Sequence, residues 1–142
     1  MRKLLLALAL ALPVLIPSAQ AQGPIVGPGQ PILCPFVAQQ SPAAAGTLGL
    51  VNGVAGKITV ICGWHVTSTQ STSSTFQFQY GTQGGPCTTP TNLTPAFSVT
   101  STAPSADHID YGSMQAPAGT QICVASTGAT VALAVMIYYS QY

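Results

Sequence analysis

The sequence has 142 residues, of which 47% are hydrophobic and only 4% are charged, with three Lys or Arg and two Asp or Glu. An average globular chain carries roughly 25% charged residues. So few cations exclude a nucleic-acid binder, which needs several Lys or Arg against phosphates, and a basic helix that lies on a membrane surface.

The chain begins with the features of a secretory signal peptide. Arg2 and Lys3 precede an apolar run over residues 4–16, and a small-residue pattern ends at Ala21. This run is shorter than the roughly 20 residues that a membrane-spanning helix needs. We therefore predict three parts: a signal peptide at residues 1–21, an N-terminal arm at 22–46 and one domain at 47–142. After cleavage following Ala21, the secreted chain would have no membrane span.

The arm at residues 22–46 begins with a stretch rich in Pro and Gly. Pro lacks the backbone donor that a central strand needs, so we expect this segment to be extended and to become fixed near Cys34. Its larger apolar side chains are candidates for docking in an assembly, and they are Ile25, Val26, Ile32 and Leu33.

The next segments show the alternation of β-strands. Residues 47–51 precede Asn52-Gly53, which favours a type I′ hairpin turn leading into a second strand. Residues 57–67 alternate strongly, and Ile61 on the opposite face indicates a central strand. The predicted inward row of this strand is Ile58, Val60, Cys62, Trp64 and Val66.

Further strands follow at short intervals. Residues 75–82 alternate most regularly, with Phe76, Phe78 and Tyr80 predicted to face inward. Shorter candidates, separated by Gly, Pro and Ser-rich turns, lie at 96–102, 109–115, 120–126 and 131–139. About seven or eight short strands with frequent turns predict an all-β domain, either a β-sandwich or a jelly roll.

The mature chain has four cysteines, Cys34, Cys62, Cys87 and Cys123. An even number in a short exported chain predicts two disulfides, with three ways to pair them. We favour Cys34–Cys62 and Cys87–Cys123, since each bond then joins an irregular segment to a strand. The rival Cys62–Cys123 would be an immunoglobulin-like bond between sheets, although Trp64 is not at the spacing which that fold uses. The absence of C-x-x-C spacing leaves zinc and redox sites without support.

Several motifs together resemble a known family. These are residues 57–64 (KITVICGW), 80–82 (YGT) with Cys87 beyond, 92–94 (NLT), and 116–119 (APAG) leading to Cys123. They resemble a recurrent small β-domain of uncharacterised exported bacterial proteins and of phage or prophage structural proteins, over about residues 34–139. The resemblance implies a compact β-sandwich with the two favoured disulfides. It implies no reaction.

One short segment holds both carboxylates, Asp107 and Asp110, with His108 between them and Tyr111 after them. These residues are the candidates for a cation or polar-ligand site. Calcium sites usually recruit more acidic oxygens than this chain has, so we favour a solvated turn whose Asp side chains cap nearby N–H groups. We assign no metal ligands and expect no cofactor.

Catalytic residues are equally sparse. His65 could pair with His108, but no motif surrounds either residue, and no Gly-x-Ser-x-Gly nucleophile turn is present. A general acid, base, nucleophile and stabiliser cannot be assembled from these residues. We therefore predict no catalytic residues and no enzymatic activity.

The leading functional hypothesis is a structural or interaction subunit that forms homo-oligomers on a cell surface or a virus-like particle. The mature chain keeps only Lys57, Asp107 and Asp110 as charged side chains, so little long-range repulsion separates copies. We expect the interface at the arm or at the C-terminal strand, if that strand lies at a sheet edge. The candidate residues of the strand are Val135, Ile137 and Tyr139.

Two alternatives stay open. A carbohydrate- or surface-binding module would use surface rings such as Tyr111, Tyr138 and Tyr142 to stack on a glycan. A pilin-like filament subunit would complete a neighbour's fold with its N-terminal strand. Prolines in the arm disfavour a continuous donor strand.

Overall fold

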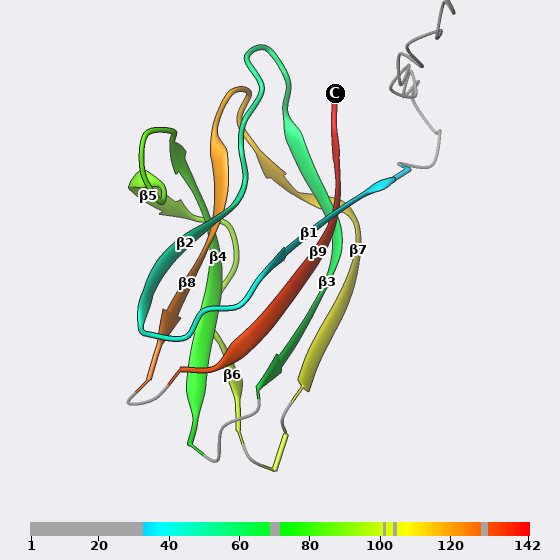
Figure 1. The fold of residues 1–142 in the computed structure, drawn as a ribbon. Coiled ribbons are helices and arrows are strands. Elements are labelled where there is room, and N and C mark those ends of the chain that lie inside the picture. Colours follow the sequence, from blue (N-terminus) through cyan, green and yellow to red (C-terminus); the bar gives the residue numbers. More distant parts are fainter. Residues whose placement is uncertain (1–32, 69–71, 101, 104, 129–130) are drawn as a thin grey trace, which may run out of the picture.

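The computed structural model describes residues 33–68, 72–100, 102–103, 105–128 and 131–142. Within these ranges nine strands and no helix form two antiparallel sheets that pack face to face (Figure 1). The all-β prediction is therefore confirmed. The predicted signal peptide and the arm residues Ile25, Val26 and Ile32 lie outside the described residues.

The first sheet, sheet A, has the strand order β1-β9-β3-β7. Its strands are β1 (Phe36–Gln40), β9 (Leu133–Gln141), β3 (Thr59–Ser68) and β7 (Ser105–Ala116). The second, sheet B, has the order β2-β8-β4-β5, and β6 also pairs with β4. Its strands are β2 (Gly46–Val51), β8 (Gln121–Thr127), β4 (Ser74–Thr82), β5 (Thr88–Asn92) and β6 (Phe97–Val99). The prediction that β3 is central is confirmed.

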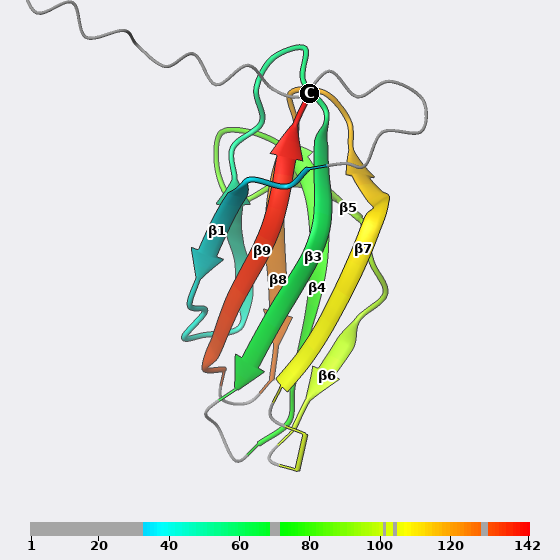
Figure 2. The same ribbon diagram turned by 90° about the vertical axis from the view of Figure 1, so that its right-hand side faces the viewer.

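The pairing is nested along the chain. Strand β1 pairs with β9, β2 with β8, β3 with β7 and β4 with β5. A long antiparallel hairpin rolled into two sheets pairs its strands in this way, and the resulting fold is a jelly roll. Most connections run from one sheet to the other, so they gather at the two ends of the sandwich (Figure 2).

Two strands were missed because neither shows the alternation of a half-buried strand. Strand β1, with the sequence FVAQQ, falls inside the predicted arm, so the sandwich begins earlier than the predicted boundary at residue 47. Strand β5, with the sequence TTPTN, is exposed along its whole length and contains Pro90. Both lie at sheet edges, where burial does not impose a pattern on the sequence.

The predicted hairpin at Asn52-Gly53 is wrong. Strands β2 and β3 belong to different sheets, and residues 52–58 cross between them at one end of the sandwich. Gly53 is needed there for close packing, because a Cβ at this position would collide with the Thr120 carbonyl oxygen. The amide of Gln121 donates to Asn52 Oδ1 (3.1 Å), and this bond helps to hold the crossing segment in place.

Within the predicted inward row of β3, Val60 is buried, but the prediction is wrong for Ile58, which is 37% exposed and precedes the strand, and for Cys62. The register of β3 with both neighbours shifts between Ile61 and Gly63. An extra residue at a bulge reverses the alternation on one side of it. Ile61, Trp64 and Val66 therefore all join the core, whereas Cys62 lies on the outer face of sheet A.

Aromatic side chains fill the space between the sheets. The ring centroid of Trp64 lies 5.2 Å from that of Phe76, 5.7 Å from Phe78 and 5.0 Å from Phe97. Such tilted and edge-to-face pairs add roughly 0.5–1.5 kcal/mol each beyond their burial. The predicted inward placement of Phe76 and Phe78 is confirmed, and Tyr80 packs partly buried against them.

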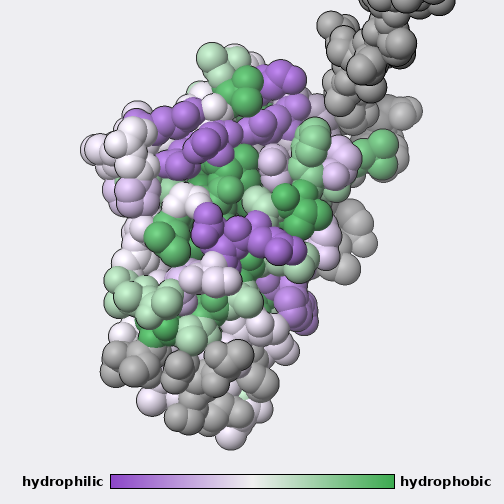
Figure 3. Space-filling model, viewed as in Figure 1, coloured by the Kyte–Doolittle hydropathy of each residue, from purple (hydrophilic) through white to green (hydrophobic). Residues whose placement is uncertain are grey.

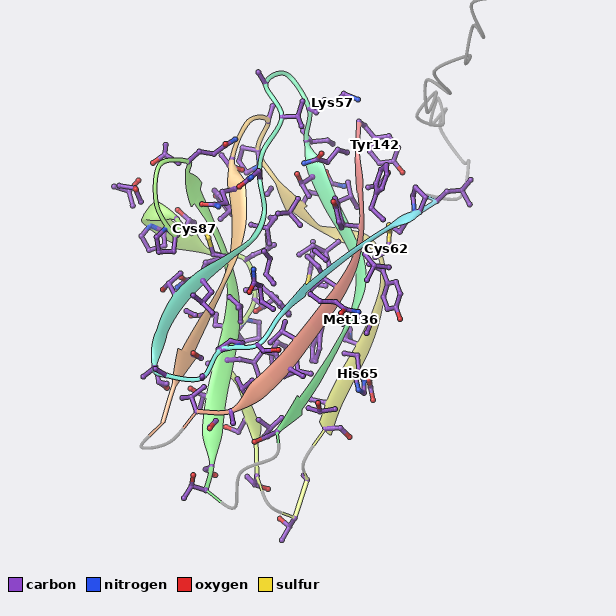
Figure 4. All side chains as sticks on the ribbon, viewed as in Figure 1. Lys57, Cys62, His65, Cys87, Met136 and Tyr142 are labelled. Atoms are coloured by element: carbon purple, nitrogen blue, oxygen red, sulfur yellow. A yellow bond between two sulfur atoms is a disulfide. The ribbon has the colours of Figure 1, made fainter. Side chains whose placement is uncertain are left out.

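Both favoured disulfides are present, Cys34–Cys62 and Cys87–Cys123, with Cα atoms 6.1 Å apart in each. The first fixes the segment before β1 to sheet A, and the second fixes the loop before β5 to β8, so the two bonds stabilise opposite parts of the molecule (Figure 4). Their sequence separations are 28 and 36 residues. Chain entropy predicts a stabilisation of about 4 kcal/mol from each.

Candidate functional site: the open edge and outer face of sheet A

The two sheets present four edges in the described part of the chain. They are β1 and β7 in sheet A, β2 in sheet B, and the side of β4 that β5 and β6 line. An edge strand offers N–H and C=O groups to any further strand, and proteins usually block such edges with charge, proline or irregular geometry.

Three of the four edges carry a blocking feature, which at the edge lined by β5 and β6 lies in β5. Strand β5 contains Pro90, and Thr89 beside it has a positive φ of 51°. Strand β7 carries Asp107 and Asp110. The pairing of β2 with β8 is irregular between Gly49 and Val51. Each feature disfavours the addition of a regular strand.

Strand β1 has none of these features. Its five residues contain no charge and no proline, and they pair with β9 without a register shift, from Phe36 opposite Tyr139 to Gln40 opposite Val135. Phe36 is 43% exposed and Val37 is 50% exposed. Successive residues of a strand face opposite sides, so apolar surface is accessible on both sides of this edge. Strand β1 lies at the margin of sheet A in Figure 2.

The apolar surface on this side of the molecule is divided. In the view that places β1 and β2 toward the reader, hydrophobic areas alternate with strongly hydrophilic ones and do not merge into one patch (Figure 3). Leu48 of β2 is also exposed there, at 38%. A contact on this side would therefore combine side-chain burial with main-chain hydrogen bonds.

The outer face of sheet A carries a polar row that crosses all four strands. The cross-strand register aligns Gln39 of β1, Met136 of β9, His65 of β3 and Asp107 of β7. His65 Nδ1 contacts Asp107 Oδ1, but the two side chains are 43% and 64% exposed. Solvent screens such a pair, so it adds little to stability.

A shallow hollow of about 210 Å³ lies over this row. It is lined by Gln39, Gln40, Ser41, His65, Thr67, Ala134, Val135 and Met136. Figure 4 shows His65 and Met136 together on this face. The hollow offers amide, hydroxyl and imidazole groups over a floor of small and apolar side chains, so it could hold a neutral polar ligand.

The two histidines do not converge. His65 faces outward, whereas the His108 ring stacks on the core residue Trp64 with their centroids 5.9 Å apart. The predicted ligand residues are therefore divided between the two sides of sheet A. Asp110 and Tyr111 belong to β7, but their side chains lie outside what the structure describes. Among the described residues no group of three His, Cys, Asp or Glu side chains is placed to hold a metal ion.

The C-terminal strand does not meet the condition set for it, a position at a sheet edge. Strand β9 lies between β1 and β3, and the side chains of Val135 and Ile137 are buried in the core. Tyr139 is half-buried, and its ring lies 5.5 Å from that of Phe36. Of the arm residues, Leu33 is described and is 59% exposed. Strand β1, and not β9, lies at this edge of sheet A.

The chain matches no model of a known protein family, and no curated protein sequence matches it. The resemblance to exported bacterial and phage structural proteins therefore stays a prediction. In the described ranges, no helix has the length and apolar character needed to cross a membrane. The two disulfides are compatible with an extracellular protein.

Proposed function

We propose that the protein is a non-enzymatic exported subunit with a structural or interaction role, which self-associates on a cell surface or a virus-like particle. The observation that carries this proposal is β1, an edge strand with neither charge nor proline and with exposed Phe36 and Val37. Main-chain groups at such an edge readily pair with another strand.

The charge of the chain supports the same proposal. After the predicted cleavage the charged side chains are Lys57, Asp107 and Asp110. Proteins rely on net charge to keep copies apart in solution. A mature chain with so few charges has little long-range repulsion against contact with a second copy.

The fold supports the proposal only by analogy. Jelly rolls occur in viral capsid proteins, in lectins and in cupin enzymes, and a shared fold does not decide between such functions. The non-enzymatic role is favoured because His65 and His108 lie on opposite sides of sheet A, so they cannot act together on one substrate. A pilin-like role has less support, since β9 is already paired on both sides by strands of its own chain.

The test is the oligomeric state of the purified mature chain, residues 22–142. Size-exclusion chromatography with light scattering should show oligomers that form without ligand and increase with protein concentration. A chain that stays monomeric at high micromolar concentration, in both low and high salt, would contradict the proposal.

The hollow on the outer face supports a second candidate function, a glycan-binding module. Its polar lining includes Gln39, His65 and Thr67, and Tyr138, on the same face as Met136, is 43% exposed. An exposed ring beside hydrogen-bonding groups can bind a sugar by stacking. Binding to neutral glycans on an array, lost in Tyr138→Ala and retained in the exposed-site control Thr91→Ala, would support this candidate. An array without binding would exclude it for the glycans tested.

A further inference from the structure

We infer that the β1 edge binds the β1 edge of a second copy, in antiparallel pairing about a two-fold axis at Ala38. This inference rests on the proposed self-association and specifies its surface, its partner and its register. Sheet A has four strands, so the two copies would form one continuous sheet of twice that size. The contact is closed, because among the described residues β1 is paired on one side, by β9, and has its other side unpaired.

Prolines limit the pairing to a short segment. Pro35 comes directly before β1, and Pro42 follows Ser41 shortly after it. Proline has no N–H to donate to a neighbouring strand. An added strand can therefore pair with β1 over little more than its five residues.

The short length selects the register. Pairing Ala38 with Ala38 of the second copy aligns all five residues of each strand. A side chain that faces the core in each copy must lie on the same face of the joined sheet. The register can therefore change only by shifts that keep every side chain on its face. The nearest such changes, which pair Val37 with Val37 or Gln39 with Gln39, align only three residues of each strand. The register centred on Ala38 therefore makes the most main-chain hydrogen bonds.

The side chains are compatible with this register. Phe36 lies opposite Gln40 of the second copy, and Val37 lies opposite Gln39, so no like charges meet. The small side chain of Ala38 at the axis lets the two backbones approach. The exposed surfaces of Phe36 and Val37 would each be covered by the aliphatic part of a glutamine.

The contact should be reversible. A contact limited to a five-residue edge should bury less surface than the roughly 800 Å² per partner of a standard stable interface. Leu48 of β2, exposed at 38%, is on the neighbouring edge of sheet B and could extend the contact. We therefore expect dimers that dissociate on dilution in the micromolar range.

Cysteine cross-linking tests the register directly. Residues opposite each other in antiparallel strands have Cα atoms about 4.5–5.5 Å apart, within the roughly 4.4–6.8 Å range of disulfides. Ala38→Cys should therefore form a covalent dimer under mild oxidation. Val37→Cys is the control, because in this register the two copies of residue 37 are diagonal neighbours about 7–8 Å apart.

The expected result is dimer formation by Ala38→Cys at least roughly tenfold faster than by Val37→Cys, measured by non-reducing electrophoresis and peptide mapping. Faster cross-linking of Val37→Cys would overturn the register. Equal slow cross-linking of both variants, in a protein that still forms oligomers, would overturn pairing through β1 and leave self-association intact. A monomeric wild-type protein would contradict the proposed function as well.

A charge variant tests the surface independently of any new cysteine. The double variant Val37→Lys/Gln39→Lys places Lys opposite Lys across the axis, at two positions that are exposed in the single copy. Like charges directly opposite destabilise a strand pair. The matched control, Thr91→Lys/Ala96→Lys, adds the same charge at two exposed positions, one in β5 and one directly before β6.

Light scattering should show that the dissociation constant of the dimer rises by roughly tenfold or more in the β1 variant. In the control it should rise by less than about twofold. Circular dichroism and thermal melting of both variants confirm that each is folded. An equal rise of the dissociation constant in both variants would mean that the added overall charge weakens the dimer. This result would overturn the assignment of the contact to β1.

Discussion

The two edges of sheet A differ in length and in charge. Strand β7 has 12 residues and holds both carboxylates of the chain, Asp107 and Asp110, whereas β1 has five residues and no charge. Both edges belong to the same sheet and flank the same central strands, β9 and β3. Where a chain has so few charged residues, their placement decides which edge is open to a partner. We expect the charge on β7 to disfavour pairing with a further strand.

The largest expected effect comes from the disulfide next to β1. Replacing Cys34 and Cys62 by Ala should lower the free energy of unfolding by about 4 kcal/mol and should weaken self-association, because the segment before β1 loses its anchor on β3. Urea unfolding and light scattering measure the two effects. The control, Cys87→Ala/Cys123→Ala, should lose similar stability with its self-association unchanged. If both double variants lose association equally, β1 is not the contact.

A smaller loss is expected from the core side chain that supports β1. Ile137 of β9 is fully buried, opposite Ala38 in the register, so Ile137→Ala should lower the free energy of unfolding by about 3 kcal/mol. Native-state hydrogen exchange should show easier local opening of β1 than of β7. Ile122→Ala in β8 is the control, since this residue is equally buried but lies in sheet B. Identical rates of amide hydrogen exchange at β1 in the two variants would show that packing of β9 does not stabilise β1.

Removing the charge from β7 should make the two edges more alike. In the background Val37→Lys/Gln39→Lys, the additional changes Asp107→Asn and Asp110→Asn should restore weak association through β7, with affinity still several-fold below wild type. The control His65→Gln removes the partner of Asp107 but keeps both carboxylates, and it should restore nothing. Continued absence of association in the Asn variant would show that charge is not what blocks β7.

The smallest effect concerns salt. Raising NaCl from about 0.05 M to about 1 M shortens the screening length strongly, yet it should change the wild-type dissociation constant by less than about twofold, because β1 has no charged residue. Analytical ultracentrifugation across this range measures the change. A loss of affinity of roughly tenfold or more at high salt would instead indicate an interface held by ion pairs.

Much of the local structure follows from the sequence alone. The alternation in residues 75–82 predicts β4 with Phe76 and Phe78 facing inward, because one side of this strand is buried against the other sheet, and the apolar run at 131–139 predicts β9 as a strand. Among the three pairings of the cysteines that the sequence allows, the favoured one is confirmed. For the candidate site, the sequence predicts a chain with few charges and an apolar C-terminal strand, but it does not show that this strand is internal in sheet A.

The pairing of strands was decided only in the tertiary structure. A period of two residues shows which side of a strand is buried, but not which strands lie beside it. The sequence therefore could not show that β9 is internal, that FVAQQ takes the edge, or that the Asn52-Gly53 segment crosses between sheets. The bulge at Ile61–Gly63 was equally hidden, because it depends on the registers of β3 with both β7 and β9. Local alternation depends on burial within each strand, whereas the choice of an open edge depends on contacts between residues far apart in the chain.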